Sequence, residues 1–293
     1  MAWPGTALVV SAAFFWGISG GIGGLLMADG WSSSVVSFYR GAIGLVFVLA
    51  WLALRPRGSG LMRPRLWLWS TLAGLGVAGN FTFYFISIAE SSVAVAATLM
   101  YCAPVFVYLA SFAFGLEKPS AAKWIAIALV MGGIVLLTGI HDVDAGDVSL
   151  VGLGAGLLAG LSYAVFIFGF KYASPHGSPQ AILSIAFAVL VVVLFWPGER
   201  GQMAEVPGTS EWPLFVALGV LGAGLSFVLY VSGVRYLLPA MASIVAMVEP
   251  VTASLFGVVV LDERLAGLQV LGMGLILITV AALSAHDSAG ASP

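Results

Sequence analysis

Two charged residues of this 293-residue chain lie inside long apolar runs, and they are the first candidates for chemistry. Glu249 directly precedes Pro250 near the middle of one run, and Arg40 lies near the start of another. A carboxylate at membrane depth is costly unless it is neutral, paired or hydrated by a cavity. Glu249 therefore either faces a central cavity, where it would bind a substrate ammonium or a proton, or forms a structural pair with Arg40 or with backbone groups. The sequence supports both interpretations equally.

Aromatic and amide side chains gather in the middle of several apolar runs. Asn80 and Tyr84, and likewise Phe227 and Tyr230, are spaced so that each pair shares one face of a helix. A mostly apolar wall with a few polar tips suits neutral amphiphiles such as amino acids. These side chains could instead face lipid or the protein core, and we favour the cavity. The predicted substrate-binding residues are Trp16, Asn80, Phe81, Tyr84, Tyr101, Tyr163, Phe166, Phe227, Tyr230 and Glu249.

Two prolines, Pro104 and Pro250, lie near the middle of two spans, at matched positions of the two halves, and the second of these spans also carries Glu249. Proline removes a backbone hydrogen bond, so each helix is predicted to kink there and to free a carbonyl that can face a polar substrate. A gating or binding role and simple shaping of the bundle are equally compatible with the sequence. The glycine runs, for example 17–24 and 152–156, are predicted to let helices pack closely. Bending during transport is the alternative for these glycines.

Nothing in the sequence indicates an enzyme, a cofactor or a metal site. The histidines His141, His176 and His286 fall in connections or near the end of the chain, and the single cysteine, Cys102, has no cysteine partner. A net charge of -2 without a basic tract argues against a nucleic-acid partner. We therefore expect no catalytic residue, a small-molecule substrate, contact with membrane lipid, and function as a monomer.

These residues are carried by elements that require a membrane. The chain is 61% hydrophobic and 8% charged, whereas soluble domains carry roughly a quarter charged residues. Its mean hydropathy is +1.09. Apolar runs of about 20 residues, the length that spans a bilayer, recur from end to end. The predicted fold class is all-α integral membrane, with ten transmembrane helices near 6–27, 34–54, 66–89, 93–115, 121–140, 149–172, 179–196, 212–236, 240–261 and 266–285.

The distribution of Lys and Arg predicts the orientation of these helices. Cytoplasmic connections carry an excess of both residues. If both termini are cytoplasmic, only Arg200 and Arg264 fall outside. The inner connections and helix ends then hold Arg55, Arg57, Arg63, Arg65, Lys118, Lys123, Lys171 and Arg235.

The two halves of the chain are weakly similar to each other. Laying the second half on the first matches Ala78-Gly79 with Ala223-Gly224, Ser87 with Ser232, Pro104 with Pro250 and Glu117 with Glu263. We predict a first five-helix repeat at 1–141 and a second at 148–286. Because five is odd, the second repeat must have inverted topology, an architecture of secondary transporters with the substrate site near the midplane. Duplication of a purely structural scaffold is the less favoured alternative.

The order and spacing of several short motifs give the chain a resemblance to the drug/metabolite transporter superfamily, specifically its ten-helix EamA-type members. The motifs are Trp16-Gly17, Phe38-Tyr39-Arg40, Ala103-Pro104-Val105, Glu117-Lys118-Pro119, Val248-Glu249-Pro250-Val251 and Asp262-Glu263-Arg264. The chain looks like amino-acid exporters of the YddG type, which favour aromatic and other neutral amino acids.

The resemblance implies a secondary transporter that exports small metabolites across a bacterial inner membrane by alternating access. Aromatic and other neutral amino acids are the leading substrate class. A multidrug or other metabolite efflux carrier is the alternative, and a channel or a structural membrane protein is less favoured, because a channel is typically built from rings of like groups.

Overall fold

The computed structural model describes residues 2–143 and 149–289, and every regular element in these residues is a helix. The first half contains α1 (Ala2–Ala28), α2 (Ser33–Leu54), α3 (Pro64–Glu90), α4 (Val93–Met100), α5 (Ala103–Ala113), α6 (Ala121–Thr138) and the short turn η1 (Ile140–Asp142). The second half contains α7 (Leu150–Ala173), α8 (Pro179–Phe195), α9 (Arg200–Glu205), η3 (Val206–Gly208), α10 (Trp212–Gly219), the π-helical η4 (Val220–Leu225), α11 (Ser226–Val234), α12 (Pro239–Ala246), α13 (Val248–Val260) and α14 (Gly267–Ala289).

In the described part of the chain, nine segments are long and apolar enough to cross a membrane. The pairs α4–α5 and α12–α13 each make one of these segments, and α10, η4 and α11 together make another. Helix α8 is equally apolar but has 17 residues, at the lower limit of the roughly 17 to 25 residues that span the hydrocarbon core. The chain is therefore an all-helical, multi-pass membrane protein, as predicted, and a tenth span through α8 stays a prediction.

Two of the predicted helices are each divided into two. The predicted helix 93–115 is interrupted at Tyr101 and Cys102, and the predicted helix 240–261 is interrupted at Met247. Pro104 and Pro250 then fall in the first turns of α5 and α13. A proline is tolerated there because the first backbone N–H groups of a helix have no intrahelical partner. Each break thus interrupts the regular α-helical pattern near the centre of its span.

The predicted connection 197–211 contains two helical turns, α9 and η3, which the sequence analysis did not anticipate. Met203 and Val206 are buried there in a cluster that includes Leu26 and Phe215. The hydroxyl of Tyr39 donates to the carbonyl of Met203 at 2.6 Å. These non-local contacts stabilise a segment that is too short to form a helix alone.

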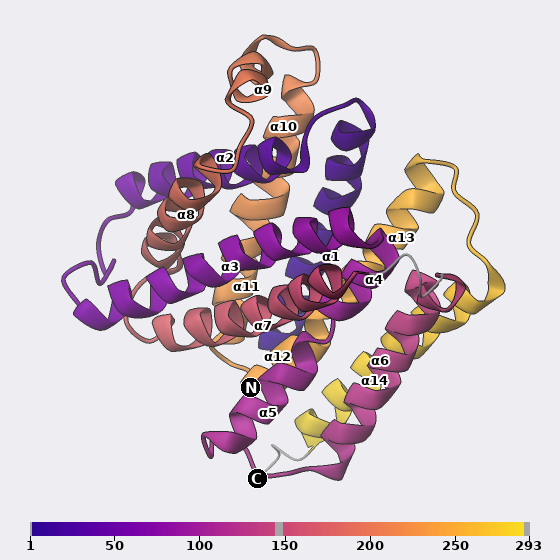
Figure 1. Ribbon diagram of the computed structural model, residues 1–293. Coiled ribbons are helices and arrows are strands. Elements are labelled where there is room, and N and C mark those ends of the chain that lie inside the picture. The colour runs from indigo at the N-terminus through magenta and orange to yellow at the C-terminus, as the bar shows by residue number, and fades with distance from the viewer. Residues whose placement is uncertain (1, 144–148, 290–293) are drawn as a thin grey trace.

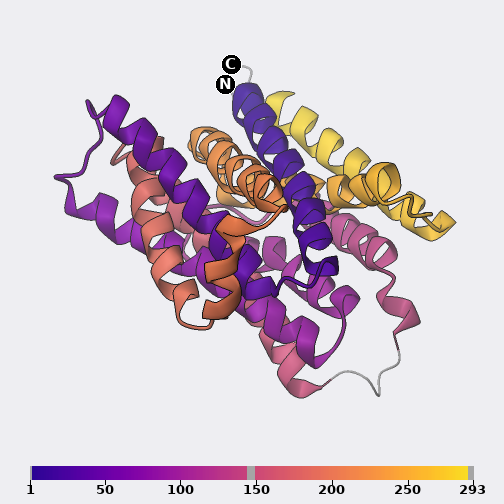
Figure 2. The same ribbon diagram turned by 90° about the horizontal axis from the view of Figure 1, so that it is seen from above.

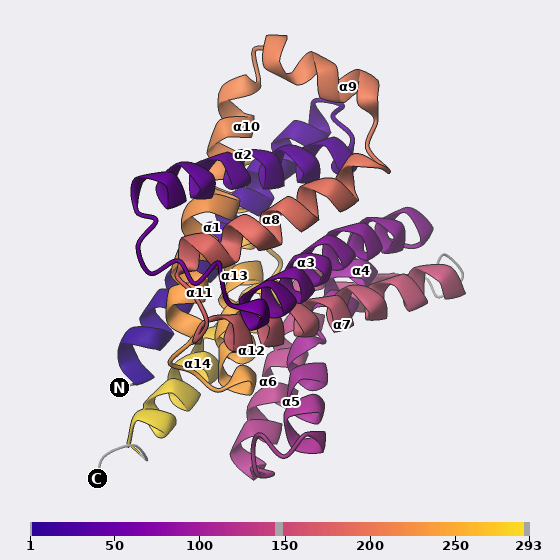
Figure 3. The same ribbon diagram turned by 90° about the vertical axis from the view of Figure 1, so that its left-hand side faces the viewer.

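Each helix of the first half has the same kind of neighbours as its counterpart in the second half. Helix α3 lies beside α7, and the span that ends in α11 lies beside α1. Helices α4 and α5 pack on α7 as α12 and α13 pack on α1, while α2 lies against α8 and α6 against α14 (Figures 1 and 3). Helix α1 starts at the same end of the bundle at which α14 finishes (Figures 1 and 2).

Small residues bring the central helices close together. An ideal Cβ atom on Gly76 of α3 would lie 2.7 Å from the backbone nitrogen of Phe166, and one on Gly169 of α7 would lie 2.7 Å from the Cα atom of Ala73. No larger side chain fits at either place, so the backbones of α3 and α7 approach closely, as expected where small residues line helix interfaces in membranes.

Candidate functional site

A cavity of about 450 Å³ lies between the two halves, with walls from α1, α2, α3, α4, α7, α10 and α13. Its deep end is formed by Trp16, Tyr163 and Glu249, which come from the middles of their spans. Met27 and Val93, at the end of α1 and the start of α4, also line it. The cavity therefore extends from the middle of the bundle towards the end at which α1 finishes and α4 begins.

Glu249 lies in the wall of this cavity because α12 ends just before it. The break at Met247 makes Glu249 part of the first turn of α13, where the positive end of the helix dipole favours a carboxylate. The hydroxyl of Tyr163 donates to Glu249 Oε2 at 3.3 Å. In the described residues the ion pair found joins Lys123 to Glu117, and none joins Arg40 to Glu249.

Arg40 is held in the cavity wall by two contacts. Its Nε and Nη2 atoms donate to the carbonyl of Gly222 at 3.1 and 2.9 Å. Gly222 lies in η4, where the wider π-helical turn replaces the regular hydrogen-bond pattern of an α-helix. The guanidinium carbon also lies 5.1 Å from the ring centre of Phe81, within the range of a cation–π contact. These contacts fix the position of the cation in the same cavity as the carboxylate of Glu249.

Trp16 closes the deep end of the cavity and is backed by an aromatic cluster. Its side chain is 3% exposed, and its ring centre lies 5.0 Å from those of Phe227 and Tyr230 and 6.2 Å from that of Phe166. Phe166, Phe227 and Tyr230 lie behind Trp16 and do not line the cavity, which differs from the sequence prediction. The reason is tertiary: α11 packs against both α1 and α7, so the three rings contact one another and fill the space between helices behind Trp16.

The remaining predicted residues line this one cavity together, from several of its walls. They are Trp16, Asn80, Phe81, Tyr84, Tyr101, Tyr163 and Glu249. Asn80 also links two helices, because its Nδ2 atom donates to the carbonyl of Ala159 on α7 at 3.0 Å. Pro104 and Pro250 do not line the cavity, although each follows a helix break closely.

One face of α1 lines the cavity and was missed by the sequence analysis. Trp16, Gly20, Gly24 and Met27 are spaced at intervals of three or four and all contact the cavity. An ideal Cβ atom on Gly20 or Gly24 would meet no other atom within 4 Å. The spacing of three or four residues from Trp16 could have predicted this face, but glycines also occur on the other faces of α1 and obscure the pattern.

Comparisons with known proteins agree with this architecture. Residues 3–139 and 150–285 match the EamA-like transporter family. An uncharacterized transporter of Archaeoglobus fulgidus is 30% identical over 94% of both chains. The threonine/homoserine exporter RhtA of Escherichia coli is 26% identical, over 70% of this chain and 66% of its own. A solved crystal structure with 18% identity covers all of both chains with a TM-score of 0.77, which shows a shared fold.

The family match covers most of the chain in two separate segments. The predicted repeat bounds, 1–141 and 148–286, stay predictions, and residues 1 and 148 lie outside the described residues. The likeness to YddG-type exporters stays a prediction. The chain belongs to the EamA-like transporter family and is a transporter, not an enzyme, which confirms the family and the class of protein predicted from the sequence.

Proposed function

We propose that this chain exports neutral amino acids, aromatic ones included, by alternating access. The observation that carries the proposal is the presence of Arg40 and Glu249 in one cavity without an ion pair between them. A zwitterionic amino acid offers a carboxylate to the guanidinium and an ammonium to the carboxylate. The apolar and aromatic walls contributed by Phe81, Tyr84 and Tyr101 suit its side chain.

The names of two relatives support an amino-acid substrate, since RhtA of Escherichia coli and RhtA of Salmonella typhimurium are named threonine/homoserine exporters. The proposed carrier works as a monomer in a bacterial inner membrane, with both termini in the cytoplasm. Its ten spans include α8 and form two five-helix repeats of inverted topology. Matching helices of the two halves have matching neighbours, and this supports the repeat.

Counterflow in proteoliposomes tests the substrate class. Vesicles preloaded with unlabelled phenylalanine, leucine, threonine or homoserine should accumulate the same labelled amino acid. Phenylethylamine, which lacks the carboxylate, and phenylpropionate, which lacks the ammonium, should compete at least about tenfold more weakly than phenylalanine, because each leaves one charged group of the cavity unpaired. Accumulation of amphiphilic drugs with no response to any amino acid would favour the multidrug alternative.

A further inference from the structure

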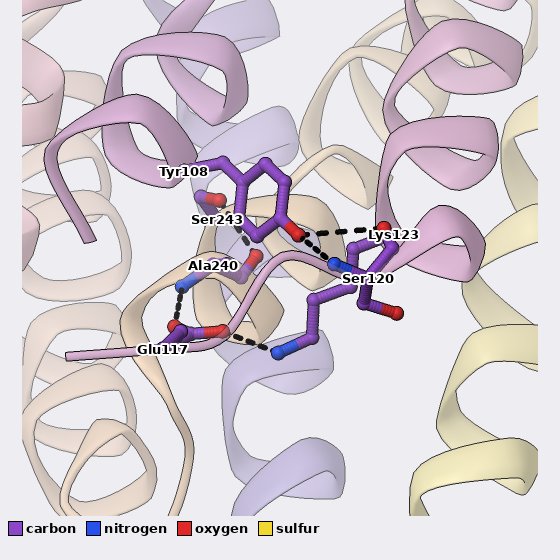
Figure 4. A network of polar contacts seen from close by, with 6 residues as sticks. All are labelled: Tyr108, Glu117, Ser120, Lys123, Ala240 and Ser243. Atoms are coloured by element: carbon purple, nitrogen blue, oxygen red, sulfur yellow. Dashed lines mark hydrogen bonds and ion pairs between the residues drawn. The ribbon is translucent and has the colours of Figure 1, made fainter. Parts of the chain in front are cut away.

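The connection between α5 and α6 lies at the end of the bundle opposite the cavity mouth. Glu117 of this connection is buried, with a side chain that is 2% exposed. Its Oε1 atom accepts a hydrogen bond from the backbone N–H of Ala240 at 3.3 Å, and its Oε2 atom pairs with Lys123 (Figure 4). Glu117 therefore joins the first half of the chain to the first turn of α12 in the second half.

The carboxylate of Glu117 supplies a cap that α12 lacks. The residue before α12 is Leu238, whose side chain makes no capping hydrogen bond, and Pro239 has no N–H group. A carboxylate beside the N-terminus of a helix satisfies a free N–H group and interacts favourably with the helix dipole. Tyr108 anchors the connection, because its hydroxyl accepts from the N–H of Ser120 at 2.6 Å (Figure 4).

The internal repeat gives counterparts to Glu117 and to Ala240, although the position that matches Lys123 is Gln269. The offset that matches Pro104 with Pro250 also matches Glu117 with Glu263. The same offset matches Ala240, in the first turn of α12, with Ala94, in the first turn of α4. An equivalent contact of Glu263 with Ala94 would therefore join the two halves at the opposite end of the bundle.

Among the residues that the structure describes, the contact of Glu117 with Ala240 is present and that of Glu263 with Ala94 is not. Glu263 is exposed, and its carboxylate lies beside Gly257 of α13. Val93, at the start of α4, is 59% exposed and lines the cavity mouth. In contrast, all residues of α12 are buried. The end that holds the Glu117 contact is thus closed, and the end at which Glu263 is free of α4 is open.

We propose that Glu117 and Glu263 are reciprocal latches of the transport cycle. Glu117 holds α12 and closes its end of the bundle while the cavity is open at the other end. When the carrier reorients, Glu117 releases Ala240. Glu263 then accepts a hydrogen bond from the backbone N–H of Ala94 and closes the end of the bundle that is open in the present structure. This inference rests on the alternating access of the proposed function, but it does not depend on which substrate is carried.

Cysteine labelling without substrate tests the latches. In a Cys102→Ser background, a reporter cysteine replaces either Ser243, which is buried one turn into α12, or Val93 at the cavity mouth. The labelling rate with N-ethylmaleimide is then measured in proteoliposomes. Glu117→Ala should raise the rate at position 243 about tenfold and lower it at position 93, because a charge-assisted hydrogen bond that favours the present state is lost. Glu263→Ala should lower the rate at position 243.

The matched control is Glu205→Ala on α9, an exposed acid that should change neither rate. Glu117→Gln keeps a hydrogen-bond acceptor without the charge and should change both labelling rates less than Glu117→Ala does. If Glu117→Ala does not fold, Glu117→Gln and Glu263→Ala, which alters an exposed residue, test the proposal in its place. Faster labelling at position 243 without slower labelling at position 93 would make Glu117 a structural clamp and overturn the proposal. An unchanged rate in Glu263→Ala would overturn it as well. If the labelling rates change reciprocally but amino-acid counterflow fails, only the proposed substrate class is refuted.

Discussion

The two charged side chains of the cavity are stabilised separately, and this separation defines what the site can bind. Burying an ion costs several kcal/mol unless its surroundings compensate. Arg40 is compensated by the carbonyl of Gly222 and the ring of Phe81, and Glu249 by Tyr163 and the first turn of α13. Because neither ion depends on direct contact with the other, both stay available to a substrate that carries both charges.

The first prediction concerns Glu249. Glu249→Gln should weaken amino-acid binding about tenfold to a hundredfold, because it removes a charge-assisted contact with the substrate ammonium, worth roughly 1.5 to 3 kcal/mol. Tyr163→Phe should weaken binding only a few-fold, because it removes one neutral donor from the carboxylate, a loss of about 1 kcal/mol. Isothermal titration calorimetry on the purified protein measures both. Equal binding by Glu249→Gln and the unaltered protein would remove the carboxylate from the site.

The second prediction concerns Arg40. Arg40→Lys keeps the positive charge but loses the planar fork on the Gly222 carbonyl and the stacking on Phe81. Binding should therefore weaken about tenfold in Arg40→Lys as well as in Arg40→Gln. If Arg40→Lys binds normally while Arg40→Gln does not, charge alone matters and the position of the guanidinium does not.

At the scale of elements, α1 uses its glycines in two ways. On one side, an ideal Cβ atom on Gly17 would lie 2.6 Å from the backbone oxygen of Glu249, so this glycine allows α1 and α13 to pack closely. On the cavity side, Gly20 and Gly24 face open space. The glycine run therefore both brings the helices together and leaves room in the cavity.

The third prediction follows from this empty space. Gly20→Leu and Gly24→Leu should reduce transport of phenylalanine about tenfold more than transport of threonine, because each leucine occupies volume that a large side chain needs. The matched control is Gly154→Leu, since an ideal Cβ atom on Gly154 also meets open space but the residue lies on an exposed face of α7 outside the cavity. Competition assays in proteoliposomes measure the ratio. A uniform loss for both amino acids would mean that these glycines do not select by size.

At the scale of the whole molecule, the pairing of helices is symmetric but the cavity is not. The same helix neighbours occur in both halves, yet only the end at which α1 finishes leads into the cavity. If the termini are cytoplasmic, this end faces away from the cytoplasm. The direction of opening therefore depends on the orientation of the chain in the membrane.

The fourth prediction tests the orientation and the tenth span together. In a Cys102→Ser background, single cysteines at Gly30, Gly201 and Asp262 should react with an impermeant maleimide in intact cells, and cysteines at Gly58 and His176 should react only after lysis. His176 and Gly201 lie on either side of α8. The same reactivity at both would mean that α8 does not cross the membrane, and the reverse pattern at all five would invert the orientation.

The sequence by itself determined the features that depend on local composition. Apolar runs of membrane length gave the spanning segments, because backbone groups in lipid must bond within their own helix. Pro104 and Pro250 marked the two divided spans, because proline limits the backbone wherever it lies. Glu249 and Arg40 were identifiable as functional candidates for the same reason, since the cost of a charge in an apolar run is visible without a fold.

Only the tertiary structure decided which side chains share the cavity. Phe166, Phe227 and Tyr230 resemble Tyr101 and Tyr163 in their sequence surroundings, but they pack behind Trp16 because α11 lies against both α1 and α7. Gly17 and Gly20 belong to one glycine run, and only the position of α13 distinguishes them. Glu117 contacts Ala240, whereas the carboxylate of its sequence counterpart Glu263 lies beside Gly257. These properties arise from contacts between helices far apart in the chain, which no local pattern encodes.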